Sequence, residues 1–270
     1  MNKYAVWGNP IAQSKSPRIH QLFAEQAGKS IEYLAKLGDE NLFEQQLKLF
    51  FAEGAKGANI TSPFKEHAFA IADEHSEACL LAEACNTLKH INGKLYADNT
   101  DGKGLVLDLQ RLGWLAPKQK VLILGAGGAT KGALYALLQT DQEITIYNRT
   151  VQKAVDLVEK FAKFGTIQTA CKADLEQSHF DLIINATSLG LQGKYVELPP
   201  HLFEQAKIYD MQYAPNMATP FLNYTKENGA KAYQDGLGML VGQASYAFEL
   251  WEGFSPNVEP VLAQLKLEMQ

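Results

Sequence analysis

The chain has 270 residues, of which 46% are hydrophobic, 10% aromatic and 20% charged. These values are typical of globular proteins and exclude a disordered tail, a collagen and a coiled-coil rod. Lysine and arginine number 25 against 30 aspartates and glutamates, so the net charge is −5 and no basic excess predicts a nucleic-acid partner.

The first hundred residues alternate between short apolar runs and amphipathic stretches, which is typical of βαβ units. Strands are predicted at 4–7, 31–37 and 58–61, and a hairpin at 87–89 and 94–96. Its turn is Asn92-Gly93, the preferred sequence for a tight hairpin. Ser16-Pro17 predicts a helix start with Ser16 as N-cap, a second helix is expected near 42–51, and Ser62-Pro63 is expected to open a third.

A helix from about 101 to 112 leads to a second β-α series. Its strands are predicted at 121–124, 143–147, 167–170, 181–186, 207–212 and 231–234. The residues from Gly236 onward are expected to be wholly helical. This organisation predicts two three-layer α/β domains with mostly parallel sheets, over 1–101 and 102–235, with the helices of 236–270 packing back on the first domain.

A glycine-rich segment follows the first strand of the second series. The segment Gly125-Ala126-Gly127-Gly128-Ala129 comes directly after the apolar run 121–124 and opens an alanine-rich helix. Glycines there permit a tight turn and let backbone N–H groups approach a pyrophosphate, which the amino end of the helix also attracts. We therefore predict a Rossmann-type dinucleotide site. Thr130 occupies the third glycine position of the usual pattern, so a strand-to-helix turn without a ligand stays open as an alternative.

The residues after the next strand predict which dinucleotide is preferred. Proteins that bind NAD usually place Asp or Glu there, against the ribose hydroxyls. This chain has Asn148-Arg149-Thr150, with Lys153 one turn further on. A carboxylate would repel a 2′-phosphate, whereas the Arg149 guanidinium can bind it by charge-assisted hydrogen bonds. We predict NADP over NAD, and the alternative is an ordinary solvated arginine.

Polar residues follow several strands of the first half. They are Ser14, Ser16, Asn59, Thr61, Lys65, Asn86, Asn99 and Asp101. Because the carboxyl ends of parallel strands meet at one edge of a sheet, we expect these side chains to lie together. Hydroxyls, amides, one ammonium and one carboxylate suit a polyhydroxylated small molecule. Each residue also has a simpler interpretation: Ser16 and Asp101 as helix caps, and Lys65 as a solvated surface residue.

These residues lie in motifs that resemble those of the shikimate dehydrogenase family. The first half contains GNPIAQSKSPRIH from residue 8, NITSPFKEHA at 59–68, ACNT at 84–87 and DNTDGKG at 98–104. The second half adds GAGGATKG, NRT, NATSLGL at 185–191, DMQYAP at 210–215 and GLGMLVGQA at 236–244. The motifs occur in the order of the family over nearly the whole chain.

The resemblance implies NADPH-dependent, reversible reduction of 3-dehydroshikimate to shikimate, a step of aromatic amino-acid biosynthesis. It implies that 1–101 binds substrate and that 102–235 binds NADP, with Lys65 and Asp101 matching the catalytic pair. Residues that bind substrate in the family match Ser14, Ser16, Asn59, Thr61, Asn86, Tyr213 and Gln243. Residues that contact the cofactor match Gly125, Ala126, Gly127, Gly128, Ala129, Asn148, Arg149, Thr150, Lys153, Thr187, Met211, Gly236, Met239 and Glu77.

The implied reaction needs a proton donor at the ketone oxygen, because hydride arriving at carbon leaves negative charge there. Lys65 as an ammonium can both stabilise and protonate that oxygen, and Asp101 would hold the ammonium and a substrate hydroxyl in position. Two other classes stay open. One is a quinate/shikimate dehydrogenase that uses NAD. The other is a non-catalytic NADP-binding sensor, which needs neither Lys65 nor Asp101.

No metal or membrane partner is predicted. The histidines and the cysteines Cys79, Cys85 and Cys171 form no metal-binding spacing, and no run approaches the ~18 apolar residues of a membrane span. Three cysteines and a start without signal-peptide features favour free thiols and a cytoplasmic location. The expected partner is a small-molecule substrate, and the expected oligomeric state is a monomer or homodimer.

Overall fold

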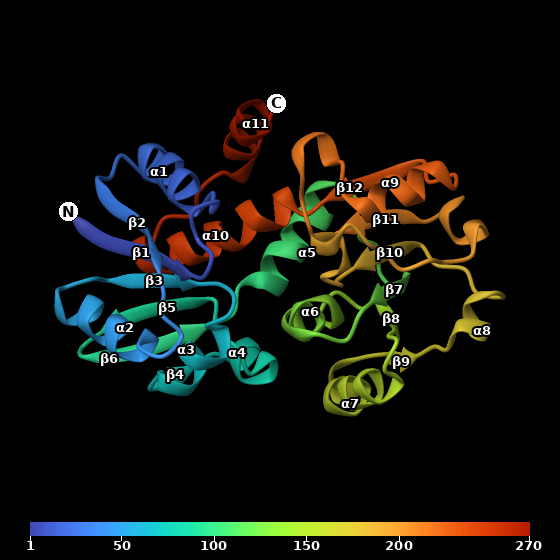
Figure 1. Cartoon of the computed structure of the whole chain (residues 1–270), viewed down its shortest axis with the longest axis horizontal. Coiled ribbons are helices and arrows are strands. Elements are labelled where there is room, and N and C mark those ends of the chain that lie inside the picture. Colours follow the sequence, from blue (N-terminus) through green and yellow to red (C-terminus); the bar gives the residue numbers. More distant parts are fainter. The chain divides into compact units, whose positions relative to one another are not determined.

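The computed structural model describes residues 1–270 and divides them into two compact units (Figure 1). The first comprises Met1–Gly104 and Val241–Gln264, and the second comprises Leu105–Leu240 and Leu265–Gln270. The boundary between Gly104 and Leu105 falls inside helix α5 (Asp101–Arg111), and the boundary between Leu240 and Val241 falls inside helix α10 (Leu237–Glu252). A helix that continues across a domain boundary leaves no turn residues in the sequence. The residues of the expected C-terminal segment, 236–270, are shared between the two units.

The first unit contains a six-stranded sheet in the order β2-β1-β3-β5-β6-β4. Its strands are β1 (Asn2–Gly8), β2 (Ile31–Leu37), β3 (Gly57–Ile60), β4 (Glu74–His75), β5 (Thr87–Ile91) and β6 (Lys94–Asp98). β1 is parallel to β2 and β3, and β4 is parallel to β6, whereas β5 is antiparallel to both of its neighbours. The hairpin through Asn92-Gly93 is confirmed, and both residues have positive φ, as its tight turn requires.

Helices cover both faces of this sheet, which gives three layers (Figure 1). On one face lie α1 (Ser16–Ala27) and α10, since His20 stacks on Tyr33 and Tyr4 stacks on Trp251. The other face carries α2 (Phe43–Ala52), whose Phe43 contacts Trp7 of β1 edge to face. The remaining helices whose residues begin in this unit are α3 (Lys65–Ile71), α4 (Glu77–Ala82) and α11 (Val258–Glu268).

Three helix limits differ from the sequence prediction. The N-cap of α1 is Lys15 and not Ser16, and the Ser14 hydroxyl accepts the Ser16 N–H at 3.3 Å instead. The third helix begins at Lys65 and not at Ser62-Pro63, because Thr61 to Phe64 form a turn first, in which Phe64 N–H donates to the Thr61 carbonyl at 3.0 Å. The last residues are not wholly helical, since α10 ends before Gly253, whose φ is 65°.

The second unit contains a fully parallel six-stranded sheet in the order β12-β11-β10-β7-β8-β9. This is the strand order of a Rossmann fold, so the predicted α/β class is confirmed. The strands are β7 (Lys120–Leu124), β8 (Glu143–Tyr147), β9 (Ile167–Thr169), β10 (Leu182–Asn185), β11 (Lys207–Asp210) and β12 (Ala232–Asp235). β10 and the last four residues of β7 are completely buried, which explains their continuous apolar runs.

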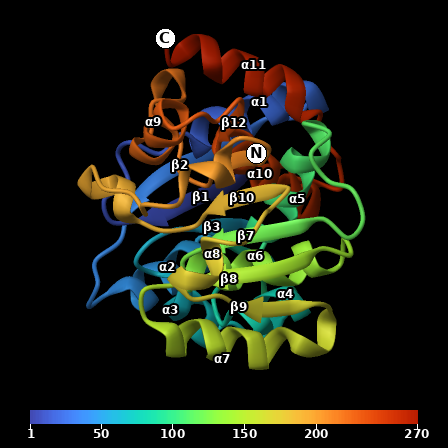
Figure 2. The same cartoon turned by 90° about the vertical axis from the view of Figure 1, so that its right-hand side faces the viewer.

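The helices of the second unit are α6 (Gly128–Leu138), α7 (Val151–Phe161), α8 (Lys172–Leu175) and α9 (Pro220–Glu227). α7 lies along β8 and β9 at one end of the sheet, and α9 lies along β11 and β12 at the other (Figure 2). None of the helices in the chain combines the length and the apolar character that crossing a membrane requires.

Candidate functional site

Polar residues of three neighbouring strands lie at one level of the first sheet. Asn59 of β3 pairs with Thr87 of β5, which in turn pairs with Asp98 of β6. Because β5 is antiparallel, its amino end and not its carboxyl end meets the carboxyl end of β3. The predicted polar edge therefore exists, but β5 contributes to it with its amino end, whereas β3 and β6 contribute with their carboxyl ends.

Lys65 and Asp101 form an ion pair beside this edge. The Lys65 Nζ atom lies 2.6 Å from Asp101 Oδ2, and the two side chains are 33% and 19% exposed. Lys65 is the first residue of α3, and its carbonyl accepts the Cys85 N–H at 2.9 Å. The second carboxylate oxygen, Asp101 Oδ1, accepts from Asn86 Nδ2 at 2.9 Å. Two side chains thus use the Asp101 carboxylate, which holds an ammonium in a partly exposed position.

The Asn86 amide links this ion pair to a buried hydrogen-bond network. Asn86 is 2% exposed, and its Nδ2 group also contacts Thr100 Oγ1 at 2.9 Å and Gln243 Oε1 at 3.2 Å. Its Oδ1 atom accepts the Thr100 N–H at 2.9 Å. A buried amide whose donors and acceptor are all used is held in one orientation. Asn86 therefore fixes Asp101, and through it the ammonium of Lys65.

Asn59 belongs to the same network. It is 5% exposed, and its Oδ1 atom accepts the hydroxyl of Tyr33 at 2.6 Å. Its Nδ2 group donates to the Asn86 carbonyl at 3.3 Å and to Thr87 Oγ1 at 3.2 Å. The predicted substrate residues Asn59, Asn86 and Gln243 thus lie together in the first unit.

The loops that carry Ser14 and Thr61 are also brought together. Thr61 N–H donates to the Trp7 carbonyl at 2.9 Å, and Asn9 N–H donates to the Ser62 carbonyl at 3.1 Å. A side chain at Gly8 would lie 2.5 Å from Thr61 Cγ2, so glycine is what allows this approach. The turn after β1 and the turn after β3 therefore form one polar surface of the first unit.

The second unit contains a cavity of about 600 Å³ at the carboxyl ends of β7, β8 and β10. It is lined by every residue of the predicted glycine-rich turn and by the predicted Asn148, Arg149, Thr150, Lys153 and Thr187. The other lining residues were not predicted: Tyr147, Ala186, Ser188, Leu189, Val196 and Glu197. Of these, Ala186, Ser188 and Leu189 lie in the motif at 185–191, whereas the other three lie in none of the motifs.

The shape and charge of this cavity fit a dinucleotide with an extra phosphate. Gly125 has a φ of 102°, and side chains added at Gly127 and Gly128 would meet no atom within 4 Å. The absence of these side chains leaves the amino end of α6 open to an anion. Arg149 and Lys153 add two cations to the lining. Ala126 N–H donates to Asn148 Oδ1 at 3.1 Å, which ties the turn to the loop after β8.

Some predicted residues lie elsewhere in the chain. Met211, Gly236 and Met239 belong to the second unit but do not line this cavity. Gly236 is packed closely, since a side chain there would lie 2.1 Å from the Met211 carbonyl oxygen. Tyr213 belongs to the second unit, whereas the other predicted substrate residues belong to the first. Glu77 lies in the first turn of α4, in the first unit.

A buried pair that was not predicted as part of the site, Asn185 and Asp210, orients Thr187. Asp210 is 0% exposed, burial raises the pKa of its carboxyl group, and its Oδ1 atom accepts from Asn185 Nδ2 at 3.0 Å. Asn185 Oδ1 in turn accepts the Thr187 hydroxyl at 2.8 Å and the Thr187 N–H at 3.1 Å. Asn185 and Asp210 each end an apolar strand, and that position is the signal by which they could have been found.

Comparison with known proteins gives matches over most of the chain. Three protein-family models match: "Shikimate dehydrogenase substrate binding domain" at 6–88, "Shikimate / quinate 5-dehydrogenase" at 109–191 and "Shikimate 5'-dehydrogenase C-terminal domain" at 236–266. The chain is 72% identical over 271 residues to the Shikimate dehydrogenase (NADP(+)) of Glaesserella parasuis serovar 5, and the match covers 100% of both sequences.

Two solved structures cover the whole of this chain and are themselves wholly covered. An Ael1 enzyme from Pseudomonas putida is 40% identical, with a TM-score of 0.93. The shikimate 5-dehydrogenase of Thermus thermophilus, solved in complex with NADP(H) and shikimate, is 31% identical, with a TM-score of 0.87.

Proposed function

Because the chain belongs to the shikimate dehydrogenase family, it is an NADP-dependent oxidoreductase, and we propose that Lys65 and Asp101 carry the proton transfer of its reversible reduction of 3-dehydroshikimate to shikimate. The observation that carries this proposal is the 2.6 Å ion pair beside a buried amide network. If Lys65 were only a solvated surface residue, it would not need the Asp101 carboxylate beside it to be held by hydrogen bonds to both carboxylate oxygens.

In this reaction the chain's own residues manage the proton. NADPH held at the glycine-rich turn would supply the hydride. The Lys65 ammonium donates a proton to the carbonyl oxygen, because that oxygen gains negative charge as the hydride is delivered. The ammonium donates a second N–H to Asp101 Oδ2, with 2.6 Å between Lys65 Nζ and that oxygen, which directs a remaining N–H toward the substrate. In the direction of shikimate oxidation, Lys65 accepts the hydroxyl proton.

We further propose that the polar surface of the first unit binds the substrate. Ser14, Ser16 and Thr61 supply hydroxyls for the hydroxyl and carboxylate groups of shikimate. Asn59 and Asn86 are buried and hold neighbouring side chains, so they keep this surface rigid. The proposal includes Gln243 and, from the second unit, Tyr213.

For the cofactor, we propose that Arg149 and Lys153 bind the 2′-phosphate and that the amino end of α6 binds the pyrophosphate. The lining of the 600 Å³ cavity supports this assignment. Thr187 has a fixed orientation in that lining and is proposed to face the nicotinamide, as are Met211, Gly236 and Met239. The proposal also keeps Glu77 as a cofactor contact.

The test is a turnover assay with a matched lysine variant. Purified protein is mixed with shikimate and either NADP+ or NAD+, and the absorbance of the reduced nicotinamide is followed. We expect Lys65→Ala to lower kcat by ~10²-fold, the scale of a lost acid–base group, with NADP+ affinity unchanged. Lys94→Ala is the control, since Lys94 forms an exposed ion pair with Glu74 and should keep its rate.

Each other result points to a different conclusion. Unchanged turnover in Lys65→Ala would remove Lys65 from the mechanism. Equal rates with both cofactors would favour a quinate/shikimate dehydrogenase, and no rate with either would favour a sensor.

We also place the protein in the cytoplasm. Its three cysteines are all free thiols, with Cys79 and Cys85 buried and Cys171 exposed. Free thiols persist where the environment is reducing, which supports this location.

A further inference from the structure

Thr87, the first residue of β5, carries a hydroxyl that is enclosed between two amides. The residue is 0% exposed. Asn59 Nδ2 donates to Thr87 Oγ1 at 3.2 Å, and the Thr87 hydroxyl donates to Asn86 Oδ1 at 2.9 Å. Because the Thr87 side chain has no exposed surface, it cannot contact a substrate. Any part that it takes in the reaction must therefore pass through these two amides.

The direction of the hydrogen bonds at Thr87 is determined by the number of protons available. A hydroxyl has one proton, so a threonine that accepts from one amide is free to donate to an acceptor on another. Thr87 accepts from Asn59, and its proton goes to Asn86 Oδ1. That oxygen also accepts the Thr100 N–H at 2.9 Å. Two donors thus hold the oxygen of the Asn86 amide and leave its Nδ2 group facing Asp101 Oδ1, at 2.9 Å.

The opposite orientation of the Asn86 amide would be unfavourable at both of its ends. Its oxygen would face Asp101 Oδ1, so two acceptors would meet without a proton between them. Its Nδ2 group would face the Thr100 N–H, so two donors would meet as well. Asn86 is 2% exposed, and no solvent replaces hydrogen bonds that are lost at such a depth. The Thr87 hydroxyl therefore helps to select the one orientation that supports the Asp101 carboxylate.

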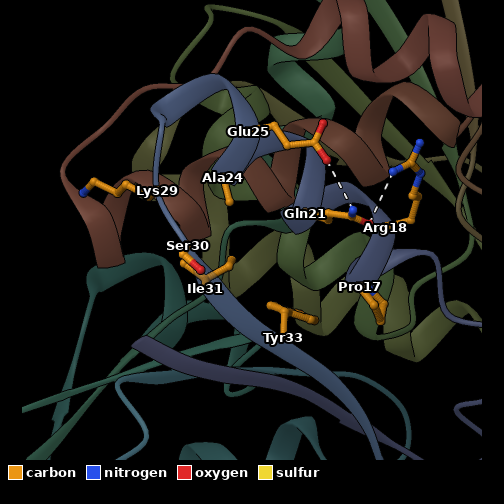
Figure 3. A pocket seen from close by; sticks show the side chains of 9 residues that line it. All are labelled: Pro17, Arg18, Gln21, Ala24, Glu25, Lys29, Ser30, Ile31 and Tyr33. Carbon is orange, nitrogen blue, oxygen red and sulfur yellow. Dashed lines mark hydrogen bonds between the residues drawn. The ribbon is translucent and has the colours of Figure 1, made fainter. Parts of the chain in front are cut away.

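Tyr33 sets the same direction one step earlier. It lies on β2 and lines a groove of about 550 Å³ beside α1 (Figure 3). Its ring stacks on His20 with 4.3 Å between centroids, and its hydroxyl donates to Asn59 Oδ1 at 2.6 Å. Burial raises the pKa of Tyr33 well above its ordinary value, so the hydroxyl keeps the proton that it donates. The oxygen of Asn59 is thereby held toward Tyr33, and its Nδ2 group is left facing Thr87.

We propose that Thr87 is a positioning residue of the reaction and that Tyr33 supports it. The donated protons run in one direction from the Tyr33 hydroxyl to the Asp101 carboxylate, through the two amides and the Thr87 hydroxyl. The chain ends where Asp101 holds the Lys65 ammonium at 2.6 Å. The inference rests on the proposed proton transfer by Lys65 and Asp101. Without the Thr87 hydroxyl, the Asn86 amide gains a second orientation, and the carboxylate that directs the ammonium is less firmly held.

The experiment separates the hydroxyl of Thr87 from its methyl group. Thr87→Val keeps the volume and removes the hydroxyl, whereas Thr87→Ser keeps the hydroxyl and removes a buried methyl group. We expect Thr87→Val to lower kcat about tenfold, the scale of one lost hydrogen bond, with the KM for NADP+ unchanged. Thr87→Ser should keep the wild-type kcat while its thermal unfolding midpoint falls. A merely structural role would instead make kcat follow stability in both variants.

A second variant and two matched controls accompany this pair. Tyr33→Phe removes the earlier hydroxyl but keeps the stacked ring, and it should lower kcat several-fold. Tyr4→Phe is its control, since the Tyr4 hydroxyl donates to Glu252, outside the chain of hydrogen bonds. Thr225→Val is the control for Thr87→Val: Thr225 is also 0% exposed, and its hydroxyl donates to the Leu222 carbonyl within α9 at 3.0 Å. Both controls should keep the wild-type kcat, and far-UV circular dichroism shows whether each variant is folded.

Combination with Asp101→Asn shows whether Thr87 acts through the carboxylate. If it does, Thr87→Val lowers the kcat of Asp101→Asn by a smaller factor than it lowers the wild-type kcat, because the two changes interrupt the same chain. Equal factors in the two backgrounds would overturn the proposal. So would a wild-type kcat in folded Thr87→Val or in folded Tyr33→Phe. A slow Asp101→Asn beside a fast Thr87→Val contradicts this inference alone, whereas a wild-type rate in Asp101→Asn contradicts the proposed proton transfer itself.

Discussion

His20 is a titratable side chain enclosed in the core of the first unit. It is 0% exposed, its ring stacks on Tyr33 with 4.3 Å between centroids, and Phe23 contacts it edge to face. Neither ring nitrogen has a hydrogen-bond partner. Desolvation lowers the pKa of His20 from 6.5 to about 3, and the nearby Asn59 side chain opposes this shift only in part. The folded protein therefore holds this imidazole neutral where an unfolded chain would protonate it.

This difference makes stability depend on pH with a definite sign. The pKa is lower in the folded state, so the stabilisation is complete above pH 6.5 and is lost as the pH falls from 6.5 toward 3. Each pH unit in that window corresponds to about 1.4 kcal/mol of unfolding free energy. At about pH 5, where only part of the window has been crossed, the loss is about 2 kcal/mol.

Urea unfolding followed by tryptophan fluorescence at about pH 7.5 and about pH 5 measures this loss. The comparison is His20→Leu, a variant of similar side-chain volume that cannot titrate. The variant loses the ring contacts at every pH, so only the change between the two pH values is informative. The wild type should lose about 2 kcal/mol more than the variant, since all other titrating groups are common to both. Equal losses in the two proteins would refute the reasoning.

Three further substitutions test the site. Asp101→Asn should lower kcat by about tenfold or more, because an amide no longer balances the charge of the Lys65 ammonium; steady-state rates at wild-type level would reduce Asp101 to a structural role. Arg149→Ala should raise the KM for NADP+ by about 10- to 100-fold, the value of one to two charged hydrogen bonds, and leave the KM for NAD+ unchanged; an unaltered ratio of the two KM values would count against the 2′-phosphate assignment. Asn185→Ala releases Thr187 and should raise the KM for NADP+ while calorimetry shows unchanged binding of adenosine 2′,5′-bisphosphate, which lacks nicotinamide; equal weakening of both ligands would show a general loss of the cavity.

Local pattern was sufficient for most of the elements and for locating the glycine-rich turn. The apolar runs of β7 and β10 predict buried strands wherever they pair, and Asn92-Gly93 predicts its hairpin from two residues. Gly125 to Ala129 indicate a phosphate-binding turn because glycine is needed there for backbone reasons alone. Short elements were missed: β4 has two residues and α8 has four, too few for any periodicity.

The amino-acid sequence by itself thus determined the fold class and the family and located the glycine-rich turn, since each depends on residues that are neighbours in the chain. Only the tertiary structure decided that antiparallel β5 brings Asn86 to the edge where Lys65 meets Asp101. It alone also placed Asp210 behind Asn185 and Thr187, and enclosed His20 without a hydrogen-bond partner. These features join residues that are distant in the chain, and distant contacts depend on how strands pair and helices pack, which no local pattern records.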